Sequence, residues 1–96
     1  MYNIIYSRRY CFITDLVGEE DCLFLGITVP GGVQNQTLKP VMVWIHGGGF
    51  FEGSGTTFMT APLAVAGDVI VVTVNYRLNI FGFLFDGEGR IICMVY

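Results

Sequence analysis

Two short runs of the chain are apolar at every or nearly every position, instead of alternating between apolar and polar residues. Residues 41–45 read VMVWI, and residues 69–74 read VIVVTV. A strand that is apolar on both faces is typical of a sheet buried between two layers, as in a parallel sheet. Both runs are therefore predicted to be strands of one buried sheet.

The segment between these two runs has the pattern of a crossover connection. Residues 57–66 are predicted to form a short helix, with Pro62 in its first turn. Gly67 and Asp68 then indicate a stop and a turn. Strand, loop, helix and strand in this order make a βαβ unit, so the predicted fold class is α/β.

The flanking sequence gives weaker signals. Residues 22–29, CLFLGITV, are rich in apolar and β-branched residues and are predicted to form a further strand. Residues 86–89, DGEG, indicate a turn, and residues 91–96, IICMVY, fit a terminal strand. Residues 1–18 show no clear period.

Composition narrows the classes of function. The chain has 96 residues, of which 53% are hydrophobic and 14% charged, so it suffices for one small domain or part of a larger one. Its net charge is −3 and its basic residues are scattered, which argues against nucleic-acid binding. No run reaches the roughly 18 apolar residues of a membrane span. No signal peptide is evident, because the N-terminal arginines follow the apolar residues.

The candidate chemistry lies in residues 44–55, WIHGGGFFEGSG, directly after the first predicted strand. Glycine lets backbone N–H groups approach a ligand closely, and two such groups can bind an oxyanion or a phosphate. No lysine follows the glycines, as a Walker A loop requires, and Glu52 stands where a dinucleotide loop needs its third glycine. HGGG after a strand fits the oxyanion hole of an acyl-transferring hydrolase better. A tight turn without chemistry is the remaining alternative.

Four motifs in register resemble the type B carboxylesterases, the cholinesterase-like serine hydrolases of the α/β-hydrolase fold. They are EDCL at 20–23, PVMVWIHGGGF at 40–50, GSG at 53–55 and GDVIVVTVNYRLNIFGFL at 67–84. The resemblance implies a partial α/β-hydrolase fold over residues 20–84, with N-terminal strands and one βαβ unit of the central sheet. Residues 1–19 and 85–96 are predicted to be divergent flanking segments.

The resemblance also implies roles for individual residues. Gly48 and Gly49 would supply oxyanion-hole amides, with support from His46, Gly47 and Phe50. His46 would be a structural element of the turn, since the family's catalytic base lies far downstream. Small-molecule esters would be the substrates of the parent protein. The family's chemistry uses no cofactor, and no metal-ligand cluster is visible in the sequence.

Other motif residues are interpreted as scaffold by the same resemblance. Arg77 is similar to the family's buried structural arginine and is expected to pair with a carboxylate further along the chain. Glu20 and Asp21 are interpreted as scaffold residues and not as an acid/base pair. The family's first disulfide joins the EDCL cysteine to one well upstream. Here the upstream residue is Cys11, much nearer to Cys22, and a Cys11–Cys22 bridge is predicted on that resemblance.

The chain departs from the family at the nucleophile. The elbow GxSxG is absent, because Glu52 and Thr56 stand where the outer glycines around Ser54 would have to be. His46 is the only histidine, so one copy cannot assemble a Ser-His-acid triad. We therefore predict a fragment of a carboxylic ester hydrolase that is inactive alone. The alternative is a non-catalytic, cholinesterase-like adhesion or binding protein.

Two further expectations follow from the family. The strand that bears the nucleophile pairs beside residues 41–45, so without it this strand has a bare apolar edge that promotes aggregation. Phe50 and Phe51 would lie near the wall of the substrate gorge or belong to the core, and both interpretations stay open. The family is often secreted or in the endoplasmic reticulum, but localisation and oligomeric state are left undetermined by this sequence.

Overall fold

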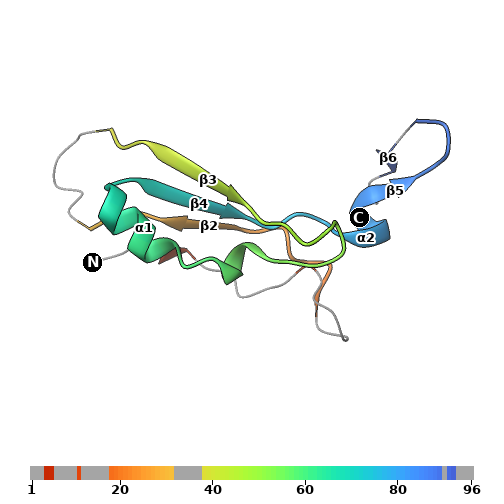
Figure 1. The fold of residues 1–96 in the computed structure, drawn as a ribbon. Helices are drawn as coiled ribbons and strands as arrows, with labels where there is room; N and C mark the ends of the chain where they lie inside the picture. The colour runs from red at the N-terminus through yellow and green to blue at the C-terminus, as the bar shows by residue number, and fades with distance from the viewer. Residues whose placement is uncertain (1–3, 6–10, 12–17, 32–37, 90, 93–96) are drawn as a thin grey trace.

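The computed structural model describes residues 4–5, 11, 18–31, 38–89 and 91–92. Their elements, in chain order, are β1 (Ile4–Ile5), β2 (Leu25–Thr28), β3 (Val41–Ile45), the 3₁₀ helix η1 (Gly55–Thr57), α1 (Thr60–Gly67), β4 (Ile70–Val74), α2 (Asn79–Phe83), β5 (Leu84–Phe85) and β6 (Ile91–Ile92). Figure 1 shows the main sheet with α1 beside it, and α2, β5 and β6 beyond one end.

Four of the strands form one mixed sheet in the order β1-β2-β4-β3. β3 and β4 are parallel, with Val43 opposite Val72, whereas β2 is antiparallel to both β4 and β1. The connection from β3 to β4 runs through η1 and α1. The predicted βαβ unit and the α/β fold class are therefore confirmed.

The predicted strand at residues 22–29 is shorter in the structure. The amide of Cys22 donates to the Glu20 carbonyl oxygen, and the amide of Phe24 donates to that of Cys22. These local turns take up backbone groups that a strand would offer to its neighbour. Sheet pairing therefore begins only at Leu25, opposite Val74.

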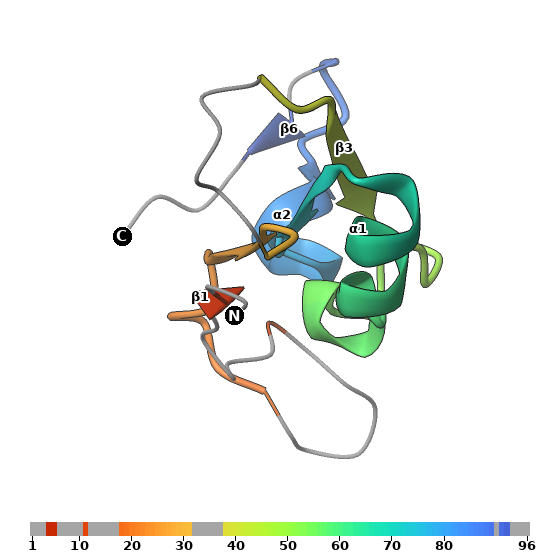
Figure 2. The ribbon, with the colours of Figure 1, turned by 90° about the vertical axis from the view of Figure 1, so that its left-hand side faces the viewer.

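Helix α1 begins later than predicted and covers one face of the sheet. Residues 55–57 form η1 instead, and α1 ends at Gly67, where the left-handed conformation of the next residue, Asp68 (φ 50°), closes the last turn. Thr60 and Ala64 are buried, and the Thr60 and Thr28 hydroxyls share a hydrogen bond. Figure 2 shows α1 on one side of the strands.

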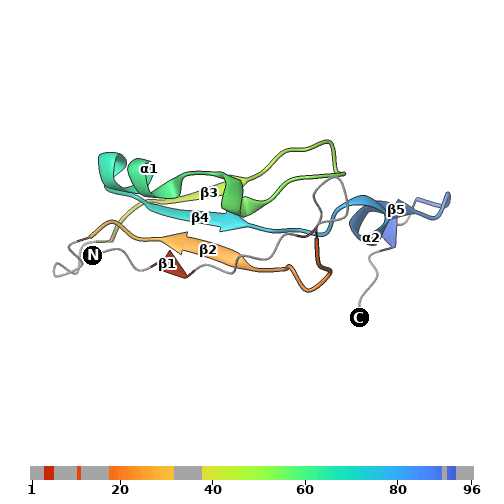
Figure 3. The same cartoon turned by 90° about the horizontal axis from the view of Figure 1, so that it is seen from below.

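The opposite face of the sheet, here called the open face, has no described helix over it. Strand alternation and register place only apolar side chains on it: Leu25, Ile27, Val41, Val43, Ile45, Ile70, Val72 and Val74. Among the described strands, none pairs with the outer edge of β3, and all five β3 residues are exposed, up to 68% at Ile45. The edge of β3 that was expected to be bare is thus exposed, whereas Ile27, Ile70, Val72 and Val74 on the open face are half-buried. Figure 3 shows β3, β4, β2 and β1 side by side.

A charge in the middle of β3 is expected to reduce self-association. Val43 lies on both the open face and the edge strand and is 58% exposed, so Val43→Lys should raise the monomeric fraction several-fold in analytical ultracentrifugation. Leu38→Lys adds the same charge at a fully exposed position outside the strand and serves as the control. Equal self-association of the two variants would mean that β3 does not mediate the self-association of the chain.

The C-terminal part contains a small hairpin that follows a helix absent from the sequence prediction. β5 pairs antiparallel with β6, and Gly87 and Gly89 in the turn between them have positive φ angles of 81° and 88°. The turn predicted at residues 86–89 is thus confirmed. The rest of the predicted terminal strand, residues 93–96, lies outside the described residues.

Candidate functional site

The three consecutive glycines Gly47, Gly48 and Gly49, here called the glycine run, lie just beyond the carboxyl end of β3. Since β3 and β4 are parallel, Ile45 and Val74 end side by side at the same edge of the sheet. Ligands of open α/β sheets bind outside this edge. The fold therefore places the glycine run where a binding site is expected.

The backbone of the glycine run takes conformations that favour glycine. Gly48 and Gly49 have φ angles of 125° and 60°. A Cβ atom on Gly48 would overlap the carbonyl oxygen of Glu52. The carbonyl oxygen of Gly48 itself accepts hydrogen bonds from the amides of Phe51 and Glu52, each at 3.1 Å. The run therefore folds into a tight turn with its carbonyl group turned inward.

The amides of Gly48 and Gly49 are open to a ligand. In the described part of the chain, neither N–H group makes a hydrogen bond, and both residues are exposed. Adjacent backbone donors without internal partners can stabilise a negative charge. The local geometry therefore suits an anion-binding loop.

His46 is held inside the turn. Its side chain is 5% exposed, and Nδ1 lies 2.9 Å from the carbonyl oxygen of Gly47. Its ring stacks on that of Tyr76, with centroids 4.3 Å apart and planes 13° apart. A Cβ atom on Gly53 would overlap this imidazole, so glycine is needed there for close packing. These contacts fit a structural role for His46 better than a role as a mobile base.

The two phenylalanines after the run are both on the surface. Phe50 and Phe51 are each 62% exposed, so neither belongs to the core of the described structure. They border a hollow of about 220 Å³, which is also lined by Asn79, Ile80 and Phe83. The hollow is apolar and adjoins the glycine run.

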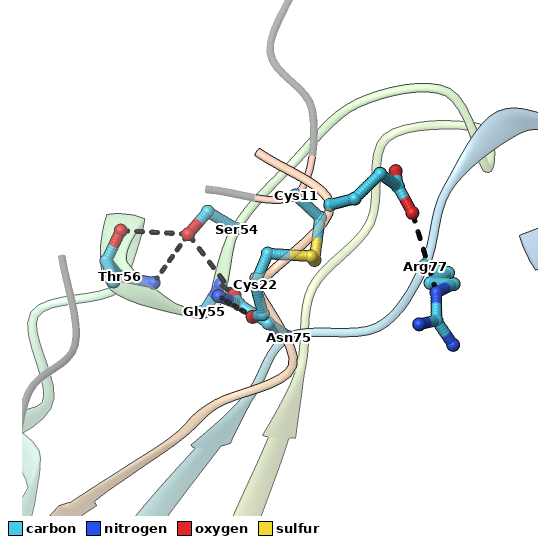
Figure 4. The surroundings of a disulfide bond; sticks show 8 residues. Cys11, Cys22, Ser54, Gly55, Thr56, Asn75 and Arg77 are labelled. Carbon is cyan, nitrogen blue, oxygen red and sulfur yellow. Dashed lines mark hydrogen bonds and ion pairs between the residues drawn. A yellow bond between two sulfur atoms is a disulfide. The ribbon is translucent and has the colours of Figure 1, made fainter. Parts of the chain in front are cut away.

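Ser54 is placed as a structural residue. It is fully buried at the N-cap of η1, where its Oγ accepts a hydrogen bond from the Thr56 amide at 3.1 Å. Asn75, just after β4, fixes the same turn, because its Oδ1 accepts from the Gly55 amide and its Nδ2 donates to the Cys22 carbonyl oxygen. Figure 4 shows these contacts. A buried capping hydroxyl is not available to attack a substrate.

A disulfide joins Cys11 to Cys22 next to this turn (Figure 4). Both half-cystines are buried and cluster with Leu78, and Tyr76 packs against them. The bridge therefore joins two parts of the segment before β2, and Leu78 and Tyr76, which follow β4, pack against it.

The predicted partner of Arg77 is wrong. Its Nε lies 3.5 Å from Oε2 of Glu20, a carboxylate earlier in the chain and not later. The antiparallel pairing of β2 with β4 explains this. Residues just before β2 return to the end of β4, which is where Arg77 lies. The structure thus gives Glu20 a scaffold contact.

The described ranges also limit two other kinds of site, a metal centre and a membrane span. They contain no group of three or more His, Cys, Asp or Glu side chains that could hold a metal ion. Their helices are too short to cross a membrane.

Comparison with known proteins identifies the relatives of this chain. The family model described as "Carboxylesterase family" matches residues 5–91. Carboxylesterase 3B of Mus musculus is 54% identical over 69 residues, which are 72% of this chain and 12% of that protein. Acetylcholinesterase-1 of Trittame loki is 50% identical over 70 residues, or 69% of this chain and 12% of that protein. The solved structure of a PNB esterase superposes with a TM-score of 0.71 at 44% identity, covering 79% of this chain and 16% of that one.

Proposed function

Because this chain belongs to the carboxylesterase family, we propose that it is the oxyanion-hole segment of a serine carboxylesterase. The chain spans only about 12% of the length of the curated relatives it matches. The rest of the catalytic machinery therefore belongs to segments outside these 96 residues. The observation that carries the proposal is the pair of open amides at Gly48 and Gly49.

In the proposed mechanism these amides act on the tetrahedral intermediate of acyl transfer. A serine outside this chain attacks the ester carbonyl carbon, and the carbonyl oxygen becomes an oxyanion. Gly48 and Gly49 donate hydrogen bonds to that oxygen and lower the barrier. Loss of one such donor costs roughly 3–4 kcal/mol of transition-state stabilisation in well-studied enzymes.

The 96-residue chain alone is proposed to be inactive. Its only histidine is 5% exposed and engaged in the turn, and the buried hydroxyl of Ser54 caps η1. Without a nucleophile and a base, an oxyanion hole supports only a residual rate. The alternative, a non-catalytic adhesion or binding protein, is disfavoured by the intact HGGGF sequence with its open amides.

A chimera tests the proposal. Residues 20–84 replace the matching segment of the PNB esterase, which supplies the rest of the domain, and p-nitrophenyl acetate hydrolysis is measured. We expect activity in the chimera and its loss in the Gly49→Asp variant. Aspartate tolerates the left-handed φ of 60° at Gly49 but places a negative charge beside the oxyanion.

Two results would contradict the proposal. One is a folded chimera with no activity, which favours the adhesion alternative. The other is equal activity with and without Gly49→Asp, which removes the oxyanion role from this loop. The 96-residue chain is assayed beside them and should show no turnover above its own Gly49→Asp variant.

A further inference from the structure

The glycine run cannot fix its own shape. Five glycines lie among residues 44–55, and glycine has the widest conformational freedom of any residue. An oxyanion hole needs donors that are held in place before the reaction, because reorganising them costs activation free energy. Some contact from outside the run must therefore hold it, and the aromatic residues around it are the candidates.

Tyr76 holds the entry to the run. It follows β4, and its hydroxyl donates a hydrogen bond of 2.5 Å to the carbonyl oxygen of His46, the residue directly before Gly47. Its ring also stacks on the His46 imidazole. One side chain thus restrains both the backbone and the side chain at the first residue of the turn.

Phe83 and Asn79 hold the exit. The Phe83 ring, at the end of α2, meets the Phe50 ring edge-on with centroids 4.6 Å apart. The backbone N–H group of Asn79 donates a hydrogen bond of 2.6 Å to the carbonyl oxygen of Phe50. Phe50 has a left-handed φ of 68°, which is costly for a residue other than glycine and persists only when its surroundings impose it.

The two supports are joined to each other. The rings of Tyr76 and Phe83 are in edge contact, with centroids 6.3 Å apart. Phe50 is 62% exposed and Phe83 is 39% exposed, so burial of apolar area does not by itself account for where these rings lie. The continuous contact from His46 through Tyr76 and Phe83 to Phe50, here called the aromatic clamp, spans the glycine run from one end to the other.

We propose that Tyr76 and Phe83 are positioning residues, which hold the Gly48 and Gly49 amides in the open arrangement described above. This inference rests on the proposed oxyanion function for its role in catalysis. Its structural content, that the clamp sets the conformation of the run, can be tested without any ester.

Hydrogen exchange of the full 96-residue chain, read by mass spectrometry, tests the clamp. The reporters are the Phe51 and Glu52 amides, which are protected only while they bond to the Gly48 carbonyl oxygen. In Tyr76→Phe, which keeps the ring but loses the hydroxyl, we expect these amides to exchange about two- to tenfold faster. The β4 amides should exchange as before.

Two matched variants at Phe83 separate ring contact from general packing. Phe83→Leu removes the aromatic edge and should accelerate exchange at Phe51 and Glu52, whereas Phe83→Tyr keeps the ring and should restore slow exchange. Phe85→Leu makes the same change at a 61% exposed residue in β5 and should have no effect on the reporters.

Three outcomes would overturn the inference. They are unprotected Phe51 and Glu52 amides in the unsubstituted chain, unchanged exchange in Tyr76→Phe and Phe83→Leu, and acceleration that is equally large in β4. Each can occur while the chimeric esterase remains active. Conversely, an inactive chimera with the expected exchange pattern would contradict the catalytic role of the Gly48 and Gly49 amides. It would still support the structural role of the aromatic clamp.

Discussion

Replacing Gly48 with alanine is expected to lower kcat of the chimeric esterase by about 10²- to 10³-fold. At φ 125° an alanine is strained, and its Cβ would overlap the carbonyl oxygen of Glu52. The turn must rearrange to relieve this overlap, and the Gly48 and Gly49 amides then leave their positions. Because the proposed role of these amides is to stabilise charge that develops in the transition state, kcat should fall much more than KM rises.

Gly47→Ala is the matched control for this experiment. A Cβ atom on Gly47 meets no heavy atom within 4 Å, and Gly47 is not among the residues with positive φ. We therefore expect its kcat to stay close to that of the unsubstituted chimera. If the two alanine variants lost activity equally, the special conformation of Gly48 would not be what catalysis needs.

Breaking the Cys11–Cys22 bridge is expected to lower the free energy of unfolding by about 3 kcal/mol. The bridge closes a loop with a sequence separation of 11 residues, and such cross-links stabilise mainly by restricting the unfolded chain. Urea unfolding at low protein concentration, with and without reductant, measures the effect. The fluorescence of Trp44, the single tryptophan, reports it, since its ring stacks on Phe58.

Cysteine variants give this measurement its controls. Cys11→Ser should be as unstable as the reduced protein and should not respond to reductant. Cys93→Ser keeps the bridge and should behave as the unsubstituted chain does. A Cys11→Ser variant with unchanged stability would show that the bridge does not support the fold in solution.

Local patterns predicted most of the central sheet. Residues 41–45 form a strand as predicted, because an apolar run between Pro40 and a glycine turn has few alternatives. The second run, 69–74, differs only in that β4 begins at Ile70. Helix α2 was missed because five residues with a glycine inside leave too short a pattern to detect.

Contacts that depend on sheet order could not be predicted in the same way. The pattern of residues 22–29 indicates a strand but not its neighbour or its direction. Only the antiparallel pairing of β2 with β4 brings Glu20 to Arg77. The expectation of a later carboxylate failed for this reason.

The site was predictable in part. HGGG marks the glycine run directly, and the fold places it at the carboxyl end of β3. The contacts of Tyr76, Asn79 and Phe83 with His46 and Phe50, which flank the run, were not foreseen, since they come from a separate segment. One feature of the sequence could have indicated these contacts. The polar sequence NYR directly follows the second buried strand and therefore lies at the same edge of the sheet as the glycine run.

The open face of the sheet also bears on how longer relatives are made. A segment similar to this one forms about 12% of carboxylesterase 3B. The motif resemblance implies that this segment belongs to the N-terminal part of the family's domain. In that position it would leave the ribosome well before most of the chain that could cover Leu25, Val43 and Ile45. Because exposed apolar strands make such intermediates prone to aggregation, nascent chains of this family are expected to require chaperones that bind extended apolar segments during synthesis.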